Sequence, residues 1–317
     1  MTDAAALRID SISKRYGDFV AVDSLSLSVP AGTVFGLLGP NGAGKTTTLR
    51  MINDILSPDS GTIVLWGNQR PGPSASPRIG YLPEERGLYP KMKVLDALRF
   101  FGELRGVPGK EAATRARRWL DRMELGRWAR HKVQDLSKGM QQKVQFITAV
   151  LHEPDLLVLD EPWSGLDPIN TEVLLDIVRE QKRANKTIVF STHLMDSAER
   201  VCDAVCIMNR ARKVLEGSVA ALRRDAAQDR SVAIVFASLD DATRARAILA
   251  DKSLVASQRE SKDVVEVELA AGADAQELLA TLVGQGVSLR RFELVQPSLH
   301  QIFIERVGAD TAQVSRG

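Results

Sequence analysis

The feature that most constrains this chain is the segment GPNGAGKTT, which runs from Gly39 to Thr47. It follows an apolar run at 33–38 and precedes a segment with a helical pattern at 46–56. A glycine-rich turn between a strand and a helix lets backbone N–H groups bind phosphate oxygens. The pattern therefore predicts a P-loop that binds a nucleoside triphosphate.

Each part of this loop has a predicted task. Glycines at 39, 42 and 44 carry no Cβ atom, so the backbone can approach phosphate oxygens closely. The helix that begins at Lys45 adds the positive end of its dipole and unpaired N–H groups. Lys45 is expected to reach the β- and γ-phosphates, and the Thr46 hydroxyl is expected to ligate Mg²⁺.

Two carboxylates follow a second apolar run. Asp160 and Glu161 end the segment DLLVLDEP, which has the continuous apolar pattern of a buried parallel strand. Ligands of α/β sheets bind at the carboxyl ends of such strands. We expect Asp160 on the Mg²⁺ side, and Glu161 to orient or deprotonate a water that attacks the γ-phosphate. His193 ends the next apolar run and is expected to bond the γ-phosphate and that water.

Alternating apolar runs and helical patterns around the P-loop predict an α/β domain with a mainly parallel sheet. We place this domain at 1–225, with a helical subdomain at about 92–150. A charged, alanine-rich stretch near 222–230 is predicted to be a linker. The order β-α-β-α-β beyond it predicts a small α+β domain at 226–308, for which a ferredoxin-like layout is one arrangement, and 309–317 is expected to be a tail.

Composition and charge indicate which partners and which cellular compartment suit the chain. The net charge of +2 gives no polycation signature for nucleic acid, and no run approaches the roughly 18 to 20 apolar residues that cross a bilayer. The two cysteines, Cys202 and Cys206, do not make a disulfide framework, which fits a reducing cytosol. The helical stretch at 94–132 is rich in arginine, and a solvated face, a partner-docking surface and a site for anionic lipid all remain open.

Several motifs in one order resemble the ATP-binding subunit of an ABC transporter, over residues 7 to about 220. They are Tyr16, the P-loop, LSKGMQQ, LLVLDEP, the SGLD turn and the histidine of STH. The C-terminal piece, ending in QPSLHQIFIERV, resembles the accessory domain of ABC ATPases that power sodium- or drug-efflux exporters. The resemblance implies a Mg²⁺- and ATP-dependent dimer on the cytoplasmic face of the cell membrane. Its other partner is then an integral membrane permease that exports an ion, a drug or a lipid-like molecule, with no nucleic acid expected.

The resemblance also implies roles for individual residues. Tyr16 matches the aromatic that stacks on adenine, Asp160 the metal-side aspartate, Glu161 the catalytic base and His193 the switch histidine. The phosphate cradle comprises Gly39, Pro40, Asn41, Gly42, Ala43, Gly44, Lys45, Thr46 and Thr47. The residues matched to the contact between subunits are Ser137 and Gly139, which would bind the γ-phosphate of ATP on the other copy, and Asp167 in the SGLD turn.

Two positions depart from the family pattern. Glu84 stands where the family usually has glutamine; a carboxylate can still ligate Mg²⁺, but it adds negative charge beside the triphosphate. The signature reads LSKGM instead of LSGGQ, and neither change is expected to inactivate the chain. The alternative function is a soluble ABC-type ATPase that acts on ribosomes or nucleic acid. A single cassette, with only about ninety residues between P-loop and signature, favours the transporter.

Overall fold

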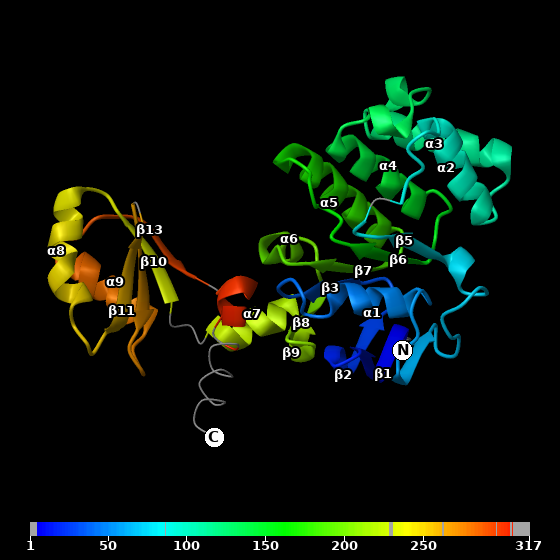
Figure 1. Ribbon diagram of the computed structural model, residues 1–317. Helices are drawn as coiled ribbons and strands as arrows, with labels where there is room; N and C mark the ends of the chain where they lie inside the picture. Colours follow the sequence, from blue (N-terminus) through cyan, green and yellow to red (C-terminus); the bar gives the residue numbers. More distant parts are fainter. Residues whose placement is uncertain are drawn as a thin grey trace. The chain divides into compact units, whose positions relative to one another are not determined.

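The computed structural model describes residues 5–85, 87–227, 231–261, 263–295, 297–304 and 306. The chain divides into two compact units, Met1–Ser218 and Val219–Gly317, which are drawn in Figure 1. The first unit contains the P-loop, and the second contains a separate hydrophobic core.

A six-stranded sheet forms the centre of the first unit, in the order β5-β6-β7-β3-β8-β9. Its first five strands are parallel, and β9 pairs antiparallel with β8. β3, β6 and β7 are buried along their whole length, as expected of parallel strands covered on both faces. The predicted α/β fold with a mainly parallel sheet is confirmed. The strands are β3 (Val34–Leu38), β5 (Ile79–Leu82), β6 (Leu156–Asp160), β7 (Thr187–Thr192), β8 (Ala204–Asn209) and β9 (Arg212–Ser218).

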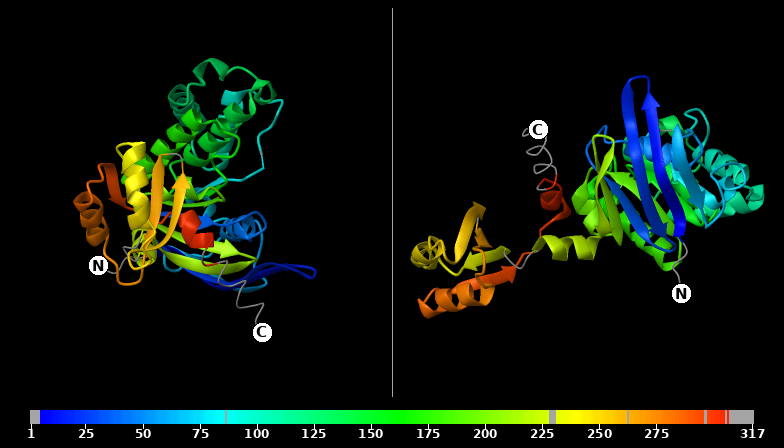
Figure 2. Two further views of the ribbon diagram at one scale, coloured as in Figure 1. Left: turned by 90° about the vertical axis from the view of Figure 1, so that its left-hand side faces the viewer. Right: turned by 90° about the horizontal axis from the view of Figure 1, so that it is seen from below.

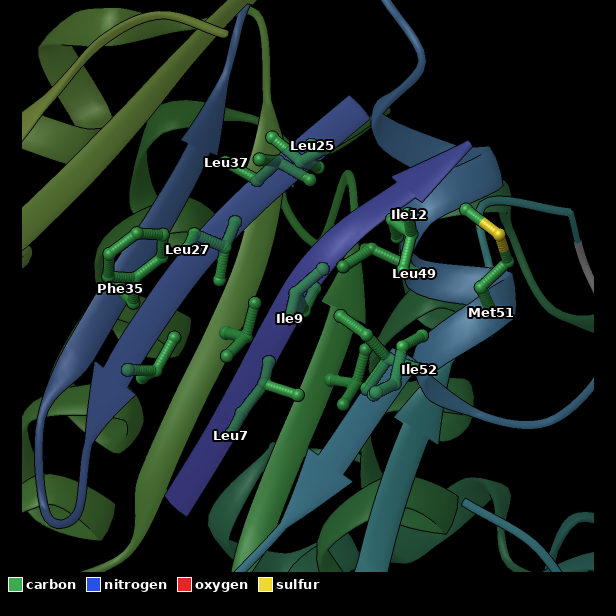
Figure 3. Packing of buried hydrophobic residues seen from close by; sticks show 14 of the residues in the cluster. Leu7, Ile9, Ile12, Leu25, Leu27, Phe35, Leu37, Leu49, Met51 and Ile52 are labelled. Carbon is green, nitrogen blue, oxygen red and sulfur yellow. The ribbon is translucent and has the colours of Figure 1, made fainter. Parts of the chain in front are cut away.

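A second, antiparallel sheet has the order β2-β1-β4, with β1 (Ala5–Tyr16), β2 (Phe19–Pro30) and β4 (Ser60–Leu65). β1 and β2 form the long hairpin that is prominent in the right-hand view of Figure 2. Their inward apolar side chains share one core with β3 and with α1 (Lys45–Ile52), as Figure 3 shows. Leu49, Met51 and Ile52 fix α1 in this core, so the helix behind the P-loop has a defined direction.

The helical part of the first unit comprises α2 (Val94–Leu104), α3 (Gly109–Arg122) and α4 (Lys138–Val150). α5 (Pro168–Arg183) and α6 (Met195–Glu199) lie on the side of the six-stranded sheet away from α1 (Figure 1). Two of the arginines in α3 are paired, Arg115 with Glu111 and Arg122 with Glu180.

The second unit has a four-stranded antiparallel sheet in the order β11-β12-β10-β13, with two helices against it. Together with the chain order β-α-β-β-α-β, this is a ferredoxin-like arrangement and confirms a small α+β unit. The elements are α7 (Val219–Ala227), β10 (Ser231–Phe236), α8 (Leu239–Leu249), β11 (Val255–Ser261), β12 (Val264–Leu269), α9 (Ala275–Gly284) and β13 (Leu289–Leu294).

One expectation for this unit was wrong, the number of its strands, and the linker stays a prediction. The predicted linker near 222–230 is helical up to residue 227, because its alanine, leucine and arginine residues are strong helix formers. The expected order β-α-β-α-β lacked β11, whose sequence VASQRES has no run of alternating apolar residues. Residues 228–230 and the predicted tail at 309–317 lie outside the described residues.

Candidate functional site

A cavity of about 360 Å³ lies where β3 turns into α1. It combines the predicted P-loop with two acids that are distant in sequence, Glu84 and Glu161. Glu84 lies just beyond β5, and Glu161 directly follows β6, so both come from the carboxyl ends of neighbouring strands. The lining residues are Phe19, Ala21, Asn41, Gly42, Ala43, Gly44, Lys45, Thr46, Thr47, Glu84 and Glu161.

The P-loop backbone has a shape that only glycine permits at two positions. Gly39 and Gly44 have φ of 147° and 103°. A Cβ atom at Gly39 would lie 2.2 Å from the carbonyl oxygen of Met208, and one at Gly44 would lie 2.3 Å from that of Ala21. Because α1 begins directly after Gly44, its first N–H groups face the cavity side of the loop and can bind an anion.

Lys45 is buried, and its Nζ donates to the carbonyl oxygens of Gly39 at 2.8 Å and Pro40 at 3.1 Å. The same Nζ lies 3.8 Å from Oε1 of Glu161. Burial lowers the pKa of Lys45, while the charge of Glu161 opposes that shift. Phosphate oxygens in the cavity would add negative charge beside this ammonium and stabilise its protonated form.

Asp160 is buried at the end of β6 and has one unpaired oxygen. Its Oδ1 accepts from Thr46 Oγ1 at 3.2 Å and from the hydroxyl of Ser191. Its Oδ2 has no hydrogen-bond partner within the part of the chain that the structure describes. Burial raises the pKa of Asp160. An unpaired buried carboxylate oxygen beside a threonine hydroxyl is a donor set that fits a hard cation such as Mg²⁺.

Glu161 is held in one orientation by residues at the end of β7. Its Oε2 accepts from Thr192 Oγ1 at 3.1 Å, while its Oε1 accepts from the backbone N–H of His193 at 3.1 Å. Nδ1 of His193 lies 2.9 Å from the same Oε1, so the structure brings this pair into direct contact. The backbone of Glu161 has φ of 46°, a strained conformation for a residue other than glycine, and such strain is concentrated at functional sites.

Three predicted site residues are not among those that line the cavity. Ser137 is exposed and caps α4, where its hydroxyl accepts from the N–H of Met140. A Cβ atom at Gly139 would lie 3.6 Å from Leu166, in the turn that precedes α5. Asp167 in that turn caps α5 by accepting from the N–H of Asn170 at 2.9 Å, and this bond lowers the pKa of Asp167.

Phe19 is a cavity residue that the sequence analysis missed. It is 60% exposed and lines the cavity, whereas Tyr16, 48% exposed, is not among the described lining residues. The two aromatics are partners across the turn of the β1–β2 hairpin. The signal in the sequence was the turn itself, since an aromatic flanks it on each side.

The fold and the cavity together define the class of protein. A P-loop joins β3 to α1, and the acids after β6 meet it at the same edge of a parallel sheet, which is the arrangement of a P-loop NTPase. The family described as "ABC transporter" matches residues 22–164. The family described as "ATP-binding protein DrrA1-3-like, C-terminal domain" matches residues 217–307.

Similar proteins identify the family. The ABC transporter ATP-binding protein YhaQ of Bacillus subtilis is 45% identical over 303 residues, which cover 96% of this chain and 99% of the relative. A Nod factor export ATP-binding protein I, from Cupriavidus metallidurans, is 41% identical over 67% of this chain and 71% of its own length. A solved structure of an ATP-binding subunit of an ABC transporter has a TM-score of 0.65 and 33% identity, and the match covers 69% of this chain and 92% of that one.

The chain therefore belongs to the ABC transporter ATP-binding proteins, a family of ATPases, and the resemblance drawn from its motifs is confirmed. ATP binding follows from this membership. None of the helices that the structure describes is long and apolar enough to cross a membrane.

Proposed function

We propose that this chain is the ATP-hydrolysing subunit of an exporter, bound to the cytoplasmic face of the membrane through a separate permease. Two copies close on two ATP molecules and open after hydrolysis, and the permease carries an ion, a drug or a lipid-like substrate. The similarity to a Nod factor export protein and the DrrA-like C-terminal match support export.

The observation that carries the proposal is the fixed carboxylate of Glu161, 3.8 Å from Nζ of Lys45. Lys45 binds the γ-phosphate and offsets its charge. Glu161, oriented by Thr192 and His193, accepts a proton from the attacking water. His193 orients that water and bonds the γ-phosphate. Lys45 and Glu161 line the cavity and His193 contacts Glu161, so a single triphosphate pose can satisfy all three.

The remaining cavity residues bind and position the nucleotide. The N–H groups from Asn41 to Thr47 hold the phosphates at the start of α1, and an exposed aromatic of the β1–β2 turn stacks on the base. Mg²⁺ would be held by Thr46, Asp160 and Glu84, where it would neutralise charge on the β- and γ-phosphates.

The dimer follows from residues that lie outside the cavity of their own copy. Ser137 is exposed at the beginning of α4, and Gly139 lies beside the turn that ends in Asp167. In the proposed dimer, Ser137 and Gly139 bind the γ-phosphate in the partner's cavity, and Asp167 connects the two sites. Hydrolysis then requires closure, because each site is completed only by the other copy.

The substitution Glu161→Gln tests the mechanism. It keeps the size and the cavity but removes the base, so we expect turnover to fall by roughly 10²–10⁴-fold while ATP binding remains. Phosphate release measures turnover, and size-exclusion chromatography with MgATP should show dimers trapped in the closed state. Glu180→Gln, on the exposed part of α5, is the control and should behave as the native chain. Full turnover in Glu161→Gln would dismiss the assignment.

The partner is tested separately. The full chain is expected to co-purify with a polytopic membrane protein and to stay in the supernatant when ribosomes are sedimented. Stable sedimentation with ribosomes, without a membrane partner, would replace the exporter by the alternative function.

A further inference from the structure

One side chain of α4 holds the loop that carries Glu84. Gln145 is 2% exposed, and its Nε2 donates to the carbonyl oxygens of Pro83 at 3.0 Å and Glu85 at 2.9 Å. These two carbonyls flank Glu84, so both amide protons bond a single short segment. Since a backbone carbonyl can only accept, the amide end of Gln145 must face this loop.

The other end of the same carboxamide has no partner. Oε1 of Gln145 is buried without a hydrogen bond in the described part of the chain. An orphan buried acceptor lowers stability, and an apolar side chain of similar size would fill this space without it. The role of Gln145 therefore lies in the two hydrogen bonds that its amide nitrogen donates to the loop, since packing alone would not require them.

Glu84 depends on its backbone for its position. Its side chain is exposed at the cavity, and no hydrogen bond or ion pair with another described residue holds its carboxylate. The bonds from Gln145 on either side are thus the contacts that fix where Glu84 enters the cavity. Arg50 of α1 adds a weaker restraint on the neighbouring Glu85, with 3.9 Å between the charged atoms.

We propose that Gln145 is a positioning residue that holds Glu84 at the nucleotide site. The inference rests on the proposed role of Glu84 as a Mg²⁺ ligand and extends it to α4. Because α4 begins beside Ser137, about two turns before Gln145, one helix carries both the surface for the other copy's ATP and the clamp on Glu84. A movement of α4 during dimer closure therefore moves Glu84 within its own cavity.

A double-mutant cycle on the full chain tests this. Gln145→Met keeps the length of the side chain but removes both donors. We expect it to lower ATP turnover by about 10- to 100-fold, as a displaced catalytic group does, and to raise the Mg²⁺ concentration at which ATP is half-bound in equilibrium binding. In a Glu84→Ala background the same substitution should cause no further loss, because Gln145 acts through Glu84. Thr148→Val is the control, since it removes a hydroxyl from the same helix and leaves the carboxamide intact.

The outcomes separate the inference from the proposed function. Full turnover in Gln145→Met, with turnover lost in Glu84→Ala, overturns only the role of Gln145. An equal further loss in the Glu84→Ala background also overturns it, because a merely structural residue would behave in this way. Full turnover in Glu84→Ala would remove Glu84 from the proposed function as well. Gln145→Glu, which keeps size but repels both carbonyls, should reproduce the loss seen with methionine while thermal unfolding shows that both variants remain folded.

Discussion

The two units bury different kinds of side chain. Among the residues that the structure describes, ten buried side chains of Met1–Ser218 are polar or charged, whereas in Val219–Gly317 Asp241 is the one such side chain. Most of the ten lie around the carboxyl ends of β6 and β7 or on α4. They are Lys45, Thr48, Gln142, Lys143, Gln145, Asp160, Glu161, Thr187, Ser191 and Thr192.

The difference shows in which unit buried polar groups lower the stability of the fold. Burying a charge or an amide costs free energy unless its partners are well placed. Among the described residues, four buried side-chain atoms of the first unit have no hydrogen-bond partner, Oδ2 of Asp160, Oε1 of Gln145, Nδ1 of His152 and Nε1 of Trp163, against one in the second unit, Nε of Arg223. In the second unit Asp241 is fully engaged, because it accepts from the hydroxyl of Ser238 and the N–H of Ser288. Substitutions of buried polar residues in the first unit should therefore change ATP binding or hydrolysis. Substitutions in the core of the second unit should change stability alone.

The largest expected effect comes from Lys45→Ala. The ammonium is expected to contact two phosphates, and each charged hydrogen bond contributes about 1.5–3 kcal/mol, so ATP affinity should fall by about 10²–10⁴-fold. Equilibrium binding of ATP to the full chain measures this, and hydrogen exchange of α9 should be unchanged. Unchanged ATP affinity in Lys45→Ala would contradict the proposed phosphate-binding role of the P-loop. It would also remove the functional difference between the two units.

Leu278→Ala in α9 is expected to have a large effect on stability and none on ATP turnover. Leu278 is 0% exposed in the core of the second unit, and removing such a side chain costs about 2–5 kcal/mol. Hydrogen exchange of β10 and β12 should show this loss while ATP turnover stays the same. Val283→Ala, 58% exposed on the same helix, is the matched control and should change stability by less than about 0.5 kcal/mol. A loss of ATP turnover in Leu278→Ala would show that the two units are not independent in function.

The sequence predicted what short contiguous motifs can encode. Lys45, Thr46 and Asp160 were expected together because the carboxyl ends of neighbouring parallel strands meet at one edge of the sheet, and the structure places them there. Apolar runs likewise predicted β6 and β7, since buried parallel strands need no alternation.

What escaped prediction depends on contacts between distant segments. β11 is an edge strand with a mostly exposed surface, so its pairing with β12 supplies what its sequence pattern lacks. Gln145 is 60 residues from Glu85 in the chain, and nothing local to it indicates that its amide faces that loop. Phe19 and Tyr16 flank one turn, and only the fold shows which of them lines the cavity.

A smaller effect is expected at this turn. Phe19→Ala should raise KM for ATP by about 2- to 12-fold, the equivalent of about 0.5–1.5 kcal/mol of aromatic stacking, and leave kcat unchanged. Tyr16→Ala is the paired variant, measured in the same steady-state assay. A larger rise in KM for Tyr16→Ala than for Phe19→Ala would favour the role that the family resemblance gives to Tyr16.

The smallest effect is expected from Asp241→Asn, and it concerns pH. The hydroxyl of Ser238 and then the N–H of Ser288 hold the pKa of Asp241 below its ordinary value of 3.8. A carboxyl group whose pKa is lower in the folded state stabilises that state above the unfolded pKa, and this contribution is lost as the pH falls through the folded value.

The free energy of unfolding of the second unit should therefore differ between the native chain and Asp241→Asn by a constant amount from pH 7 to about pH 5. The difference should shrink below about pH 4, where the Asp241 carboxylate takes up a proton in the unfolded chain while it stays ionised in the folded one. Chemical denaturation followed by hydrogen exchange of α8 measures it, with the exposed neighbour Asp240→Asn as the control. A difference that does not change with pH would mean that Asp241 acts through shape and not charge, and Asp241 would then be unlike the buried acids around the P-loop.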